Sequence, residues 1–374
     1  MPGQLGRVVA AGLAAGALLG LPLAAPPSAH ADIEDLIFQP VLDSIAQAVS
    51  SVDPSLALSM DPGLDVSSLV APALAATDVS PLAAALPDNA IPLTMTDVTE
   101  PLIHLSISGG SDIPVLLDTG SNGLVVPWYD IGLNHLTLPT GSGIGAYSGG
   151  LDYFYVTLPD QTVDLGNGIE SGPTNVDVEL FAWPTTLQGL FLHPNFESFL
   201  APAQASGVLG IAPDAFGPDR GDTAVISALP GDLNQGVLIN EPGGYVQFGP
   251  NSLDPVTTVN GVAGADLKIQ IGATGAVVPV SNAIIDSGGV YGTVPQSLLD
   301  NGQVGQVLAP GELIKVYDES GHLLYSYTTT TTNTPTIVAS GDPLNTGYEP
   351  FVQGPVYIGY GGAVPTTTFD YSPH

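Results

Sequence analysis

Two short stretches of this sequence place an aspartate at the end of an apolar run and follow it with a hydroxyl residue and a glycine. The first reads V-L-L-D-T-G-S-N-G at residues 115–123, and its aspartate is Asp118. Asp is uncommon in strands and costly to bury without hydrogen bonds. The stretch is therefore either an ordinary exit from a strand into a turn or a carboxylate placed for chemistry. Because Asp and Gly are common turn residues, the first stretch alone favours the turn.

A second stretch, A-I-I-D-S-G-G at residues 283–289, shifts this balance. Asp286 again follows three apolar residues and precedes a small hydroxyl residue and a glycine. Both stretches continue into a short apolar segment that ends in a proline, at 122–127 and 290–295. The two aspartates lie 286 − 118 = 168 positions apart, one in each half of the chain. Such a long-range copy predicts two similar lobes, each of which contributes one carboxylate.

Each aspartate is also followed, further along the chain, by an apolar segment that contains a glycine. The segment S-G-V-L-G-I-A, with Gly210, follows the first aspartate, and F-V-Q-G-P-V-Y-I, with Gly354, follows the second. A glycine inside a strand often marks a place where another backbone passes closely. We therefore expect the strands that carry Gly210 and Gly354 to run beside the two aspartate loops.

From about residue 91 onward the chain consists of short runs rich in Val, Ile, Thr, Tyr and Phe, broken by Gly, Pro and Asn. Examples are L-I-H-L-S-I-S-G-G, Y-F-Y-V-T-L-P and T-N-V-D-V-E-L-F, which are strand and hairpin signals. The sequence therefore predicts a mostly β fold, with an N-terminal lobe over 91–240 and a C-terminal lobe over 241–374. We also expect the threonine run at 328–332 to form an exposed strand, because β-prone residues flank it.

The first 31 residues have the features of a signal peptide. They combine one positive charge, an apolar stretch over residues 8–25 and an A-x-A cleavage site at 29–31. The apolar stretch is long enough for an uncleaved membrane anchor, but its Gly/Ala richness and the cleavage site favour removal. We therefore expect an exported protein, secreted or held in the cell envelope, that touches a membrane only if this segment is retained.

Residues 32–90 form a separate region, with one short amphipathic helix followed by repeated proline breaks. This composition is typical of an extended linker. The region is either a tether or a removable pro-segment of the domain that follows. The lack of a basic run that could pair with an acidic site favours the tether.

The charge balance is strongly acidic, with four basic residues against 36 acidic ones and a formal net charge of −32 at pH 7. Such a chain repels nucleic acid and anionic membranes. Hydrophobic residues make up 44%, so the acidic composition does not indicate disorder. Self-repulsion falls as carboxylates become protonated near about pH 4, so the composition suits an acidic setting.

The sequence contains no cysteine, which excludes disulfides, cysteine nucleophiles and Cys₂His₂ zinc sites. Its six histidines are scattered and form no H-E-x-x-H motif, so none of them is assigned a role. We expect no metal and no cofactor.

Taken together, the motifs resemble those of the pepsin-like aspartic proteases over residues 91–374. The resemblance rests on the ordered set V-L-L-D-T-G-S-N-G-L-V-V-P, S-G-V-L-G-I-A, A-I-I-D-S-G-G-V-Y-G-T-V-P and Q-G-P-V-Y-I. More narrowly, G-A-Y-S-G-G-L-D-Y-F-Y, D-L-N-Q-G-V-L-I and D-S-G-G-V-Y-G look like the aspartic protease domains of mycobacterial PE/PGRS surface proteins. The resemblance implies a bilobal fold with a cleft between two β lobes and one aspartate at the tip of a loop from each lobe.

In that family two neighbouring carboxylates cannot both ionise, so the pair shares a proton. The resemblance implies that Asp118 and Asp286 form such a dyad, in which one member activates a water and the protonated partner donates to the scissile carbonyl. Because the pair titrates as a unit, the roles of base and acid are not assigned to single residues. The resemblance also implies supporting roles, through close backbone approach, hydroxyl bracing or a donor to a carboxylate, for Gly120, Gly288, Thr119, Ser287 and Ser121.

One position departs from the pepsin pattern. Gly289 stands where pepsins usually carry Ser or Thr, whose hydroxyl would donate to Asp286. Without that donor we expect the ionised form of Asp286 to be less stabilised, which places the acid limb of the pH profile higher than in pepsins. A threonine at position 289 is then expected to lower it. The PE-linked domains share D-S-G-G, which indicates a variant site rather than an inactive one.

The resemblance further implies a flap hairpin over the cleft. The run G-S-G-I-G-A-Y-S-G-G-L-D-Y-F-Y-V-T, which begins at residue 141, has a G-G turn between β-prone segments. Its aromatic candidates are Tyr147 and Tyr153, and either could be an ordinary packing residue of a strand. Tyr147 is favoured because it comes just before the turn.

The sequence therefore predicts an aspartic endopeptidase that cuts extended, apolar polypeptide segments of secreted or cell-surface proteins. Two alternatives remain. The chain could be an inactive peptide- or carbohydrate-binding protein on the same fold, although a binding protein has no need of both D-[TS]-G loops. It could also be an acidic structural protein of the cell envelope, which only the linker supports.

Overall fold

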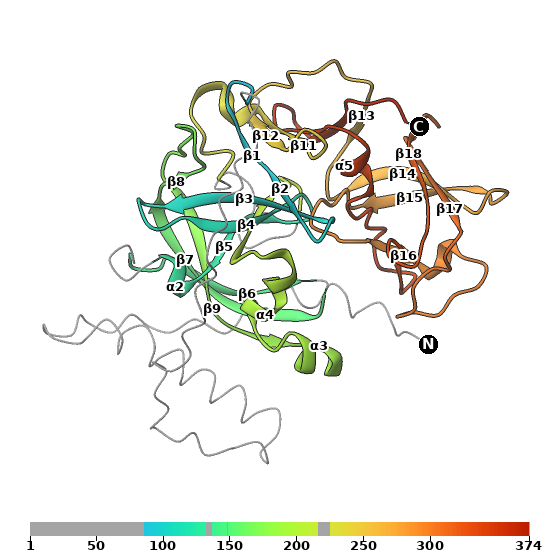
Figure 1. The fold of residues 1–374 in the computed structure, drawn as a ribbon, viewed down its shortest axis with the longest axis horizontal. Coiled ribbons are helices and arrows are strands. Elements are labelled where there is room, and N and C mark those ends of the chain that lie inside the picture. Colours follow the sequence, from blue (N-terminus) through green and yellow to red (C-terminus); the bar gives the residue numbers. More distant parts are fainter. Residues whose placement is uncertain (1–85, 132–136, 148, 216–224, 374) are drawn as a thin grey trace, which may run out of the picture. The chain divides into compact units, whose positions relative to one another are not determined.

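The computed structural model describes residues 86–131, 137–147, 149–215 and 225–373 (Figure 1). The predicted signal peptide and residues 32–85 of the predicted linker lie outside these ranges. Across the described residues the protein is mostly β with short helices, which confirms the predicted fold class. No helix in these ranges is long and apolar enough to cross a membrane.

A large sheet, here called the N-terminal sheet, carries the first aspartate. Its strands, in spatial order, are β2 (Thr94–Thr96), β3 (Glu100–Ile107), β4 (Ile113–Asp118), β10 (Gly207–Ile211), β5 (Asn122–Pro127), β9 (Thr174–Pro184), β7 (Leu151–Gln161) and β6 (Gly141–Tyr147), and β8 (Val163–Asp164) pairs with β3. Strand β10 runs parallel to β4 and antiparallel to β5. Every residue of β5 and β10 is buried, as expected for continuous apolar runs that are covered on both faces.

A second sheet, here called the joining sheet, draws its strands from both halves of the described chain. In spatial order these are β1 (Ala90–Pro92), β12 (Tyr245–Phe248), β11 (Gly236–Asn240), β20 (Val356–Gly359), β21 (Thr366–Phe369) and β13 (Thr257–Asn260). The predicted boundary between residues 240 and 241 falls within the β11–β12 hairpin of this sheet. The two halves are therefore linked by continuous backbone hydrogen bonding.

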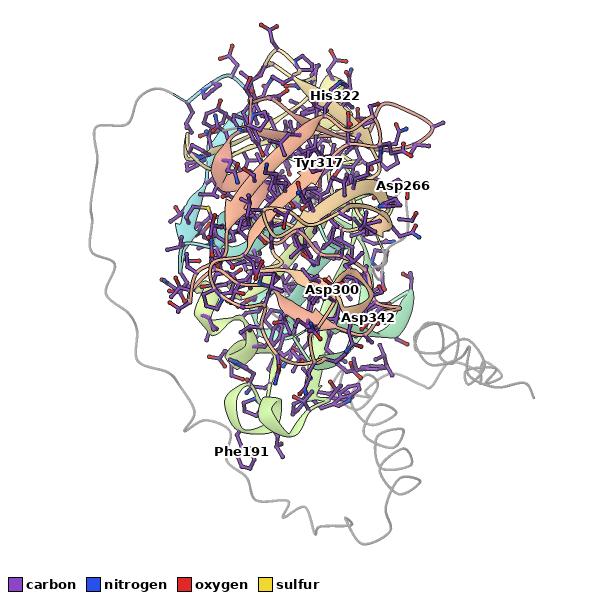
Figure 2. The ribbon with its side chains drawn as sticks, turned by 90° about the vertical axis from the view of Figure 1, so that its right-hand side faces the viewer. Phe191, Asp266, Asp300, Tyr317, His322 and Asp342 are labelled. Atoms are coloured by element: carbon purple, nitrogen blue, oxygen red, sulfur yellow. The ribbon has the colours of Figure 1, made fainter. Side chains whose placement is uncertain are left out.

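The C-terminal sheet contains the strand that leads to the second aspartate. Its strands are β15 (Val277–Ala283), β14 (Ala265–Ile271), β17 (Leu313–Tyr317) and β18 (Leu323–Thr328), and a separate pair is formed by β16 (Thr293–Pro295) and β19 (Thr336–Val338). Figure 2 shows Asp266 on β14, Tyr317 on β17 and His322 in the connection to β18. The His322 ring lies 2.9 Å from the carboxylate of Asp318, a local contact within this connection.

The helices of the described residues are short and lie between strands. They are α2 (Trp128–Ile131), α3 (Leu187–Leu192), α4 (Phe196–Leu200) and α5 (Glu349–Gln353), with 3₁₀ turns η5 (Ala201–Ala203), η6 (Gly231–Gln235) and η7 (Gln296–Leu298). Asn195 begins α4 with a capping box, since its side chain accepts from Ser198 N–H and the Ser198 hydroxyl accepts from Asn195 N–H. Phe191 on α3 is 82% exposed and points away from the sheets in Figure 2.

The hydrophobic core extends across both halves and reaches the two aspartate loops. Leu117 and Ile285, which directly precede the aspartates, are fully buried in this core. A smaller cluster, here called the flap cluster, contains Leu116, Tyr153 and Phe196, with Tyr147 and Phe199 packed against it. The position of each aspartate is thus set by tightly packed strands.

The threonine run at 328–332 corrects one prediction. Strand β18 ends at Thr328, and the following threonines are irregular at 329–330 and form bends at 331–332, so they are not an exposed strand. The hydroxyl of Thr329 donates to the carbonyl of Ala309 at 2.7 Å and accepts from Glu312 N–H at 2.9 Å. Side-chain bonds to another loop replace strand pairing here, a competition that threonine hydroxyls readily enter.

The packing of β10 predicts the effect of a single methyl group. A Cβ built at Gly210 would lie 2.5 Å from the backbone N of Asn122 and 2.6 Å from the carbonyl carbon of Ser121. Since these are backbone atoms, we expect Gly210→Ala to lower the free energy of unfolding by about 1–3 kcal/mol. Gly361→Ala is the control, because a Cβ there meets nothing within 4 Å. Equal denaturation midpoints for the two variants would contradict the close approach at Gly210.

Candidate active site

Asp118 is the last residue of β4 and opens the short loop that leads into β5. Its side chain is 8% exposed. Gly120 N–H donates to Oδ1 at 2.8 Å, and the Ser121 hydroxyl donates to Oδ2. Both carboxylate oxygens are therefore held by the loop that follows the aspartate.

Asp286 lies just beyond β15 and is likewise 8% exposed. Gly288 N–H donates to its Oδ1 at 3.0 Å, which repeats the bond from Gly120 to Asp118. Its backbone N–H donates to the hydroxyl of Thr346 at 3.1 Å, and the amide Nδ2 of Asn345 donates to its Oδ2. The second carboxyl group is thus held partly by a segment some sixty residues away in the sequence.

The two loops meet so closely that only glycine fits between them. A Cβ built at Gly120 would lie 2.5 Å from Oδ2 of Asp286, and one at Gly288 would lie 3.0 Å from Oδ1 of Asp118. Each loop therefore presents bare backbone to the carboxyl group of the other. This is the close approach that the resemblance implies for Gly120 and Gly288.

Crossed hydrogen bonds tie the loops together. The Thr119 hydroxyl donates to the carbonyl of Ile285 at 2.7 Å and accepts from Ser287 N–H at 2.8 Å. The Ser287 hydroxyl donates to the carbonyl of Leu117 at 2.7 Å and accepts from Thr119 N–H at 3.1 Å. Both side chains are fully buried, so this symmetric set of bonds is shielded from water.

The electrostatics of the site follow from this contact. Burial, then the negative charge of Asp118 and a hydrogen bond with it, raise the pKa of Asp286 well above its ordinary value. The Asn345 amide and Gly288 N–H oppose this rise in pKa without cancelling it. The pair therefore retains a proton at a pH at which a free aspartic acid has lost it. Among the described residues, no cluster of three His, Asp or Glu side chains is arranged to hold a metal ion.

Gly210 lies beside the first aspartate, because the register of β10 pairs it with Asp118 on one side and Gly123 on the other. The expectation for Gly354 is wrong. Gly354 ends α5 ahead of β20 in the joining sheet, and a Cβ there would lie 2.4 Å from the ring of Tyr371.

The segment that does run beside the second aspartate is 344–347. Asn345 forms a parallel bridge with Ile284 and an antiparallel bridge with Thr293. Gly347, two residues further on, is the counterpart of Gly210, since a Cβ there would lie 2.7 Å from the backbone N of Gly292. The only sequence signal was the short L-N-T-G, in which polar residues precede the glycine. The apolar F-V-Q-G-P-V-Y-I was a more strand-like but misleading choice.

The structure also corrects the expectation for Gly289. The position provides no hydroxyl, but the outer oxygen Oδ2 of Asp286 still has a donor, because Asn345 supplies it. A Cβ at Gly289 would lie 2.5 Å from Oδ1 of Asn345, so a threonine there would collide with this amide. The predicted deficit of hydrogen bonding at Asp286 is therefore not present.

The predicted flap is the β6–β7 hairpin, in which Tyr147 pairs with Leu151 at the turn. The Tyr147 ring stacks on Tyr153, with centroids 5.1 Å apart, and on Phe199 of α4 at 5.6 Å. Burial, followed by the charges of Tyr153 and Asp118, raises the pKa of Tyr147 well above its ordinary value. Tyr147 packs against the flap cluster that contains Leu116, which lies on the face of β4 that carries Asp118. Tyr153 is 3% exposed and is a packing residue of the flap cluster.

Glu100 is a site neighbour that sequence reasoning missed. It begins β3 and is 8% exposed. Burial, followed by the charges of Asp118 and Asp97, raises the pKa of Glu100 to about 7. A single glutamate at the start of a strand carries no local signal of this kind, because its proximity to Asp118 depends on the antiparallel register of β3 and β4, in which Leu102 pairs with Leu116.

The crossed hydroxyl bonds generate a stability prediction. Thr119→Val keeps the side-chain shape but leaves the carbonyl of Ile285 and the N–H of Ser287 buried without their partner. We expect a loss of about 1–3 kcal/mol in the free energy of unfolding, and a similar loss for Ser287→Ala. Ser340→Ala, at an exposed position, is the control for loss of a hydroxyl. Urea unfolding measures all three, and a cost no larger than that of the control would show that the bonds do not stabilise the fold.

Comparison with known proteins agrees with this geometry. The family described as the PE-PGRS C-terminal aspartyl peptidase-like domain matches residues 89–368. PE cleavage protein A of Mycobacterium tuberculosis (strain ATCC 25618 / H37Rv) is 42% identical over 298 residues, which cover 75% of this chain and 51% of that protein. PE cleavage protein A of Mycobacterium marinum (strain ATCC BAA-535 / M) is 41% identical over 297 residues, covering 75% and 52%. This chain thus spans about half the length of these relatives. It belongs to the family of PE-PGRS C-terminal aspartyl peptidase-like domains.

Proposed function

We propose that this protein is an aspartic endopeptidase in which Asp118 and Asp286 activate a water for attack on a peptide bond. The observation that carries the proposal is the contact between the two aspartate loops, where each glycine lies against the opposite carboxyl group. Two buried carboxyl groups in contact are costly unless they share a proton. A binding groove gains nothing from this arrangement, so it favours the peptidase over a binding or structural protein.

The proton balance follows from the site. One carboxyl group of the dyad holds the shared proton in the free enzyme, and the other is the carboxylate that accepts a proton from the attacking water. The water oxygen bonds to the carbonyl carbon while the shared proton passes to the carbonyl oxygen, which gives a neutral tetrahedral diol. Collapse of the diol breaks the C–N bond: the amide nitrogen takes the proton that the dyad received from water, and one diol hydroxyl gives its proton to the other carboxylate, so the dyad again holds a single proton. The two residues exchange roles within one turnover.

The substrate class follows from the surroundings of the dyad. Leu116, two residues before Asp118, belongs to the flap cluster with Tyr153 and Phe196. Because alternate residues of a strand face the same side, this apolar cluster lies on the side of the sheet that carries Asp118. The arrangement suits apolar side chains of an extended polypeptide. The name of the relatives and the predicted signal peptide support an exported enzyme that acts on secreted or cell-surface proteins, PE proteins among them.

An acidic working pH is part of the proposal. Burial raises the pKa of Glu179 to about 7 and that of Glu241 to about 8, and Glu100 titrates near 7. In the unfolded chain the pKa of a glutamate is about 4.3. Since the folded pKa values are higher, the stability that these groups contribute is fully present below the unfolded value and is lost as the pH rises toward 7–8. Among the described residues neither carboxylate oxygen of Glu241 has a hydrogen-bond partner, so its ionisation is especially unfavourable.

The first functional prediction concerns the dyad itself. Asp118→Asn and Asp286→Asn are each expected to lower peptide cleavage by at least about a hundredfold while the fold persists, because one carboxyl group cannot act as both base and acid. Asp266→Asn on β14 is the matched control, since Asp266 is exposed and belongs to neither loop. Cleavage of unfolded protein and a peptide library at pH 3 to 7, with and without a statine-type inhibitor, measures the effect. Near-normal cleavage by either variant would show that Asp118 and Asp286 are not a catalytic dyad.

The second functional prediction separates the two flap tyrosines. Tyr147→Ala is expected to lower kcat/KM far more than stability, because Tyr147 adjoins the flap turn and packs on the face of β4 that carries Asp118. Tyr153→Ala is expected to cost about 3–5 kcal/mol of unfolding free energy, because it removes a buried ring. Tyr147→Phe, which keeps the ring, controls for stacking on Phe199. If both alanine variants change only the melting temperature, neither residue serves a flap.

A further inference from the structure

We propose that Asn345 is the positioning residue of the second aspartate, and that it replaces the hydroxyl that pepsin-like sites carry at the position of Gly289. The inference rests on the proposed function, because it assigns a role within the dyad. It concerns a donor that comes from a distant segment and has no counterpart around Asp118, where Ser121 fills this place.

The orientation of the Asn345 side chain is fixed by its neighbours. Its backbone N–H donates to the carbonyl of Thr293 at 3.1 Å and its carbonyl accepts from Thr293 N–H at 3.0 Å. Its Oδ1 accepts from Gly347 N–H at 2.8 Å. A backbone N–H can only donate, so Oδ1 must face Gly347 and the amide Nδ2 must face Oδ2 of Asp286. These hydrogen bonds fix the orientation of the Asn345 side chain, so its amide is held in position to donate to Asp286.

Gly289 provides the room for this amide. A Cβ at position 289 would lie 2.5 Å from Oδ1 of Asn345 and 2.8 Å from Oδ2 of Asp286. Gly289 is absent from the glycines with positive φ, so its backbone conformation does not itself require glycine. The requirement is one of space. A hydroxyl residue at position 289 would collide with an asparagine at position 345. This chain carries the asparagine, together with a glycine at 289.

The change from hydroxyl to amide has a chemical consequence. The Ser121 hydroxyl can donate or accept, so it suits Asp118 in either protonation state. The NH₂ group of Asn345 can only donate, so it cannot accept a hydrogen bond from a proton on Oδ2 of Asp286. The proton of neutral Asp286 is therefore confined to Oδ1, the oxygen that Gly288 N–H also contacts. Asn345 thus directs the shared proton and fixes the carboxyl plane.

Within the described part of the chain, few charged groups act on Asp286. Asp118 faces it from the first loop and acts on its ionisation. Glu100 of β3 and Tyr147 and Tyr153 of the flap hairpin lie close enough to interact with Asp118. A pH effect that arises through Asn345 must therefore disappear when Asp286 is made neutral.

The test compares four proteins: wild type, Asn345→Ala, Gly289→Ser and the double variant. Loss of the donor is expected to lower kcat by about tenfold to a hundredfold, because a hydrogen bond to a charged group is lost. It also makes ionisation of Asp286 less favourable, so the alkaline limb of the pH profile moves up by about one pH unit. Gly289→Ser alone is expected to be impaired by collision with the amide.

The decisive result is a reversal of sign. Asn345→Ala is expected to harm the wild type but to improve Gly289→Ser, because the double variant regains a hydroxyl donor and loses the shorter of the two contacts, which leaves only the 2.8 Å approach to Oδ2 of Asp286 for a small shift of that side chain to relieve. If the double variant recovers kcat to within about threefold of wild type, and its alkaline limb lies at the wild-type pH, a hydroxyl at position 289 can replace the amide of Asn345. An unmoved alkaline limb in Asn345→Ala, or a folded double variant no better than Gly289→Ser, overturns it. Asn345→Leu is the alternative if the alanine variant does not fold, since it keeps a side chain of similar size and removes the donor without adding a titratable group, and unaltered kcat for it also overturns the proposal.

A second readout does not depend on catalysis. Asp286 has a raised folded pKa, so its contribution to stability is lost as the pH rises from the unfolded value toward the folded one. Without the Asn345 donor, the fall in unfolding free energy is expected to continue to a pH about one unit higher than in wild type. In an Asp286→Asn background the two pH curves are expected to coincide. Unfolding free energies measured from pH 4 to 8 detect it, and identical curves for wild type and Asn345→Ala overturn the proposal. If wild type cleaves nothing but the curves differ as expected, the peptidase assignment fails and the role of Asn345 stands.

Discussion

Two carboxyl groups in contact inside a protein cannot both be charged, and the architecture around the dyad serves to hold them in that unfavourable position. Removing an ion from water costs several kcal/mol, whereas each crossed hydroxyl bond contributes only about 1 kcal/mol. The bonds from Thr119 and Ser287 therefore cannot stabilise two neighbouring charges. A shared proton removes one charge, and the buried strands around Leu117 and Ile285 supply the rigidity that keeps the pair together.

The two lobes use different residues to hold their aspartates in place. In the N-terminal sheet a complete strand, β10, brings Gly210 beside Asp118, and the following loop supplies the Ser121 hydroxyl. In the second half two isolated bridges at Asn345 hold a short segment beside the aspartate loop, and this segment also provides the donor to Asp286. Because backbone geometry is shared but side chains are not, the pseudo-symmetry is strict for the inner oxygens, which accept from Gly120 and Gly288, and broken for the outer ones.

The acidic composition and the buried carboxyl groups point in the same direction. A net charge of −32 at pH 7 favours expansion of the chain, and protonation relieves it. Glu179 and Glu241 are each less than a tenth exposed and are most favourably accommodated when neutral. Surface repulsion and interior desolvation therefore both weaken as the pH falls. A dyad that needs one proton operates under the same conditions that favour the fold.

Much of this arrangement is local and could be read from the sequence: strands that end in an aspartate, the hydroxyls and glycines next to it, and a hairpin with tyrosines near its turn. These features depend on neighbours within a few residues, and the structure places Asp118 and Asp286 together with Thr119 and Ser287 between them. The contacts that were missed join residues far apart in the chain. Asn345 reaches Asp286 across 59 positions, and the segment 344–347, rather than the one that contains Gly354, lies beside the aspartate loop. No local pattern encodes which segment will lie there, because that choice depends on how the joining sheet takes up β20 and leaves 344–347 free to pair with the aspartate loop.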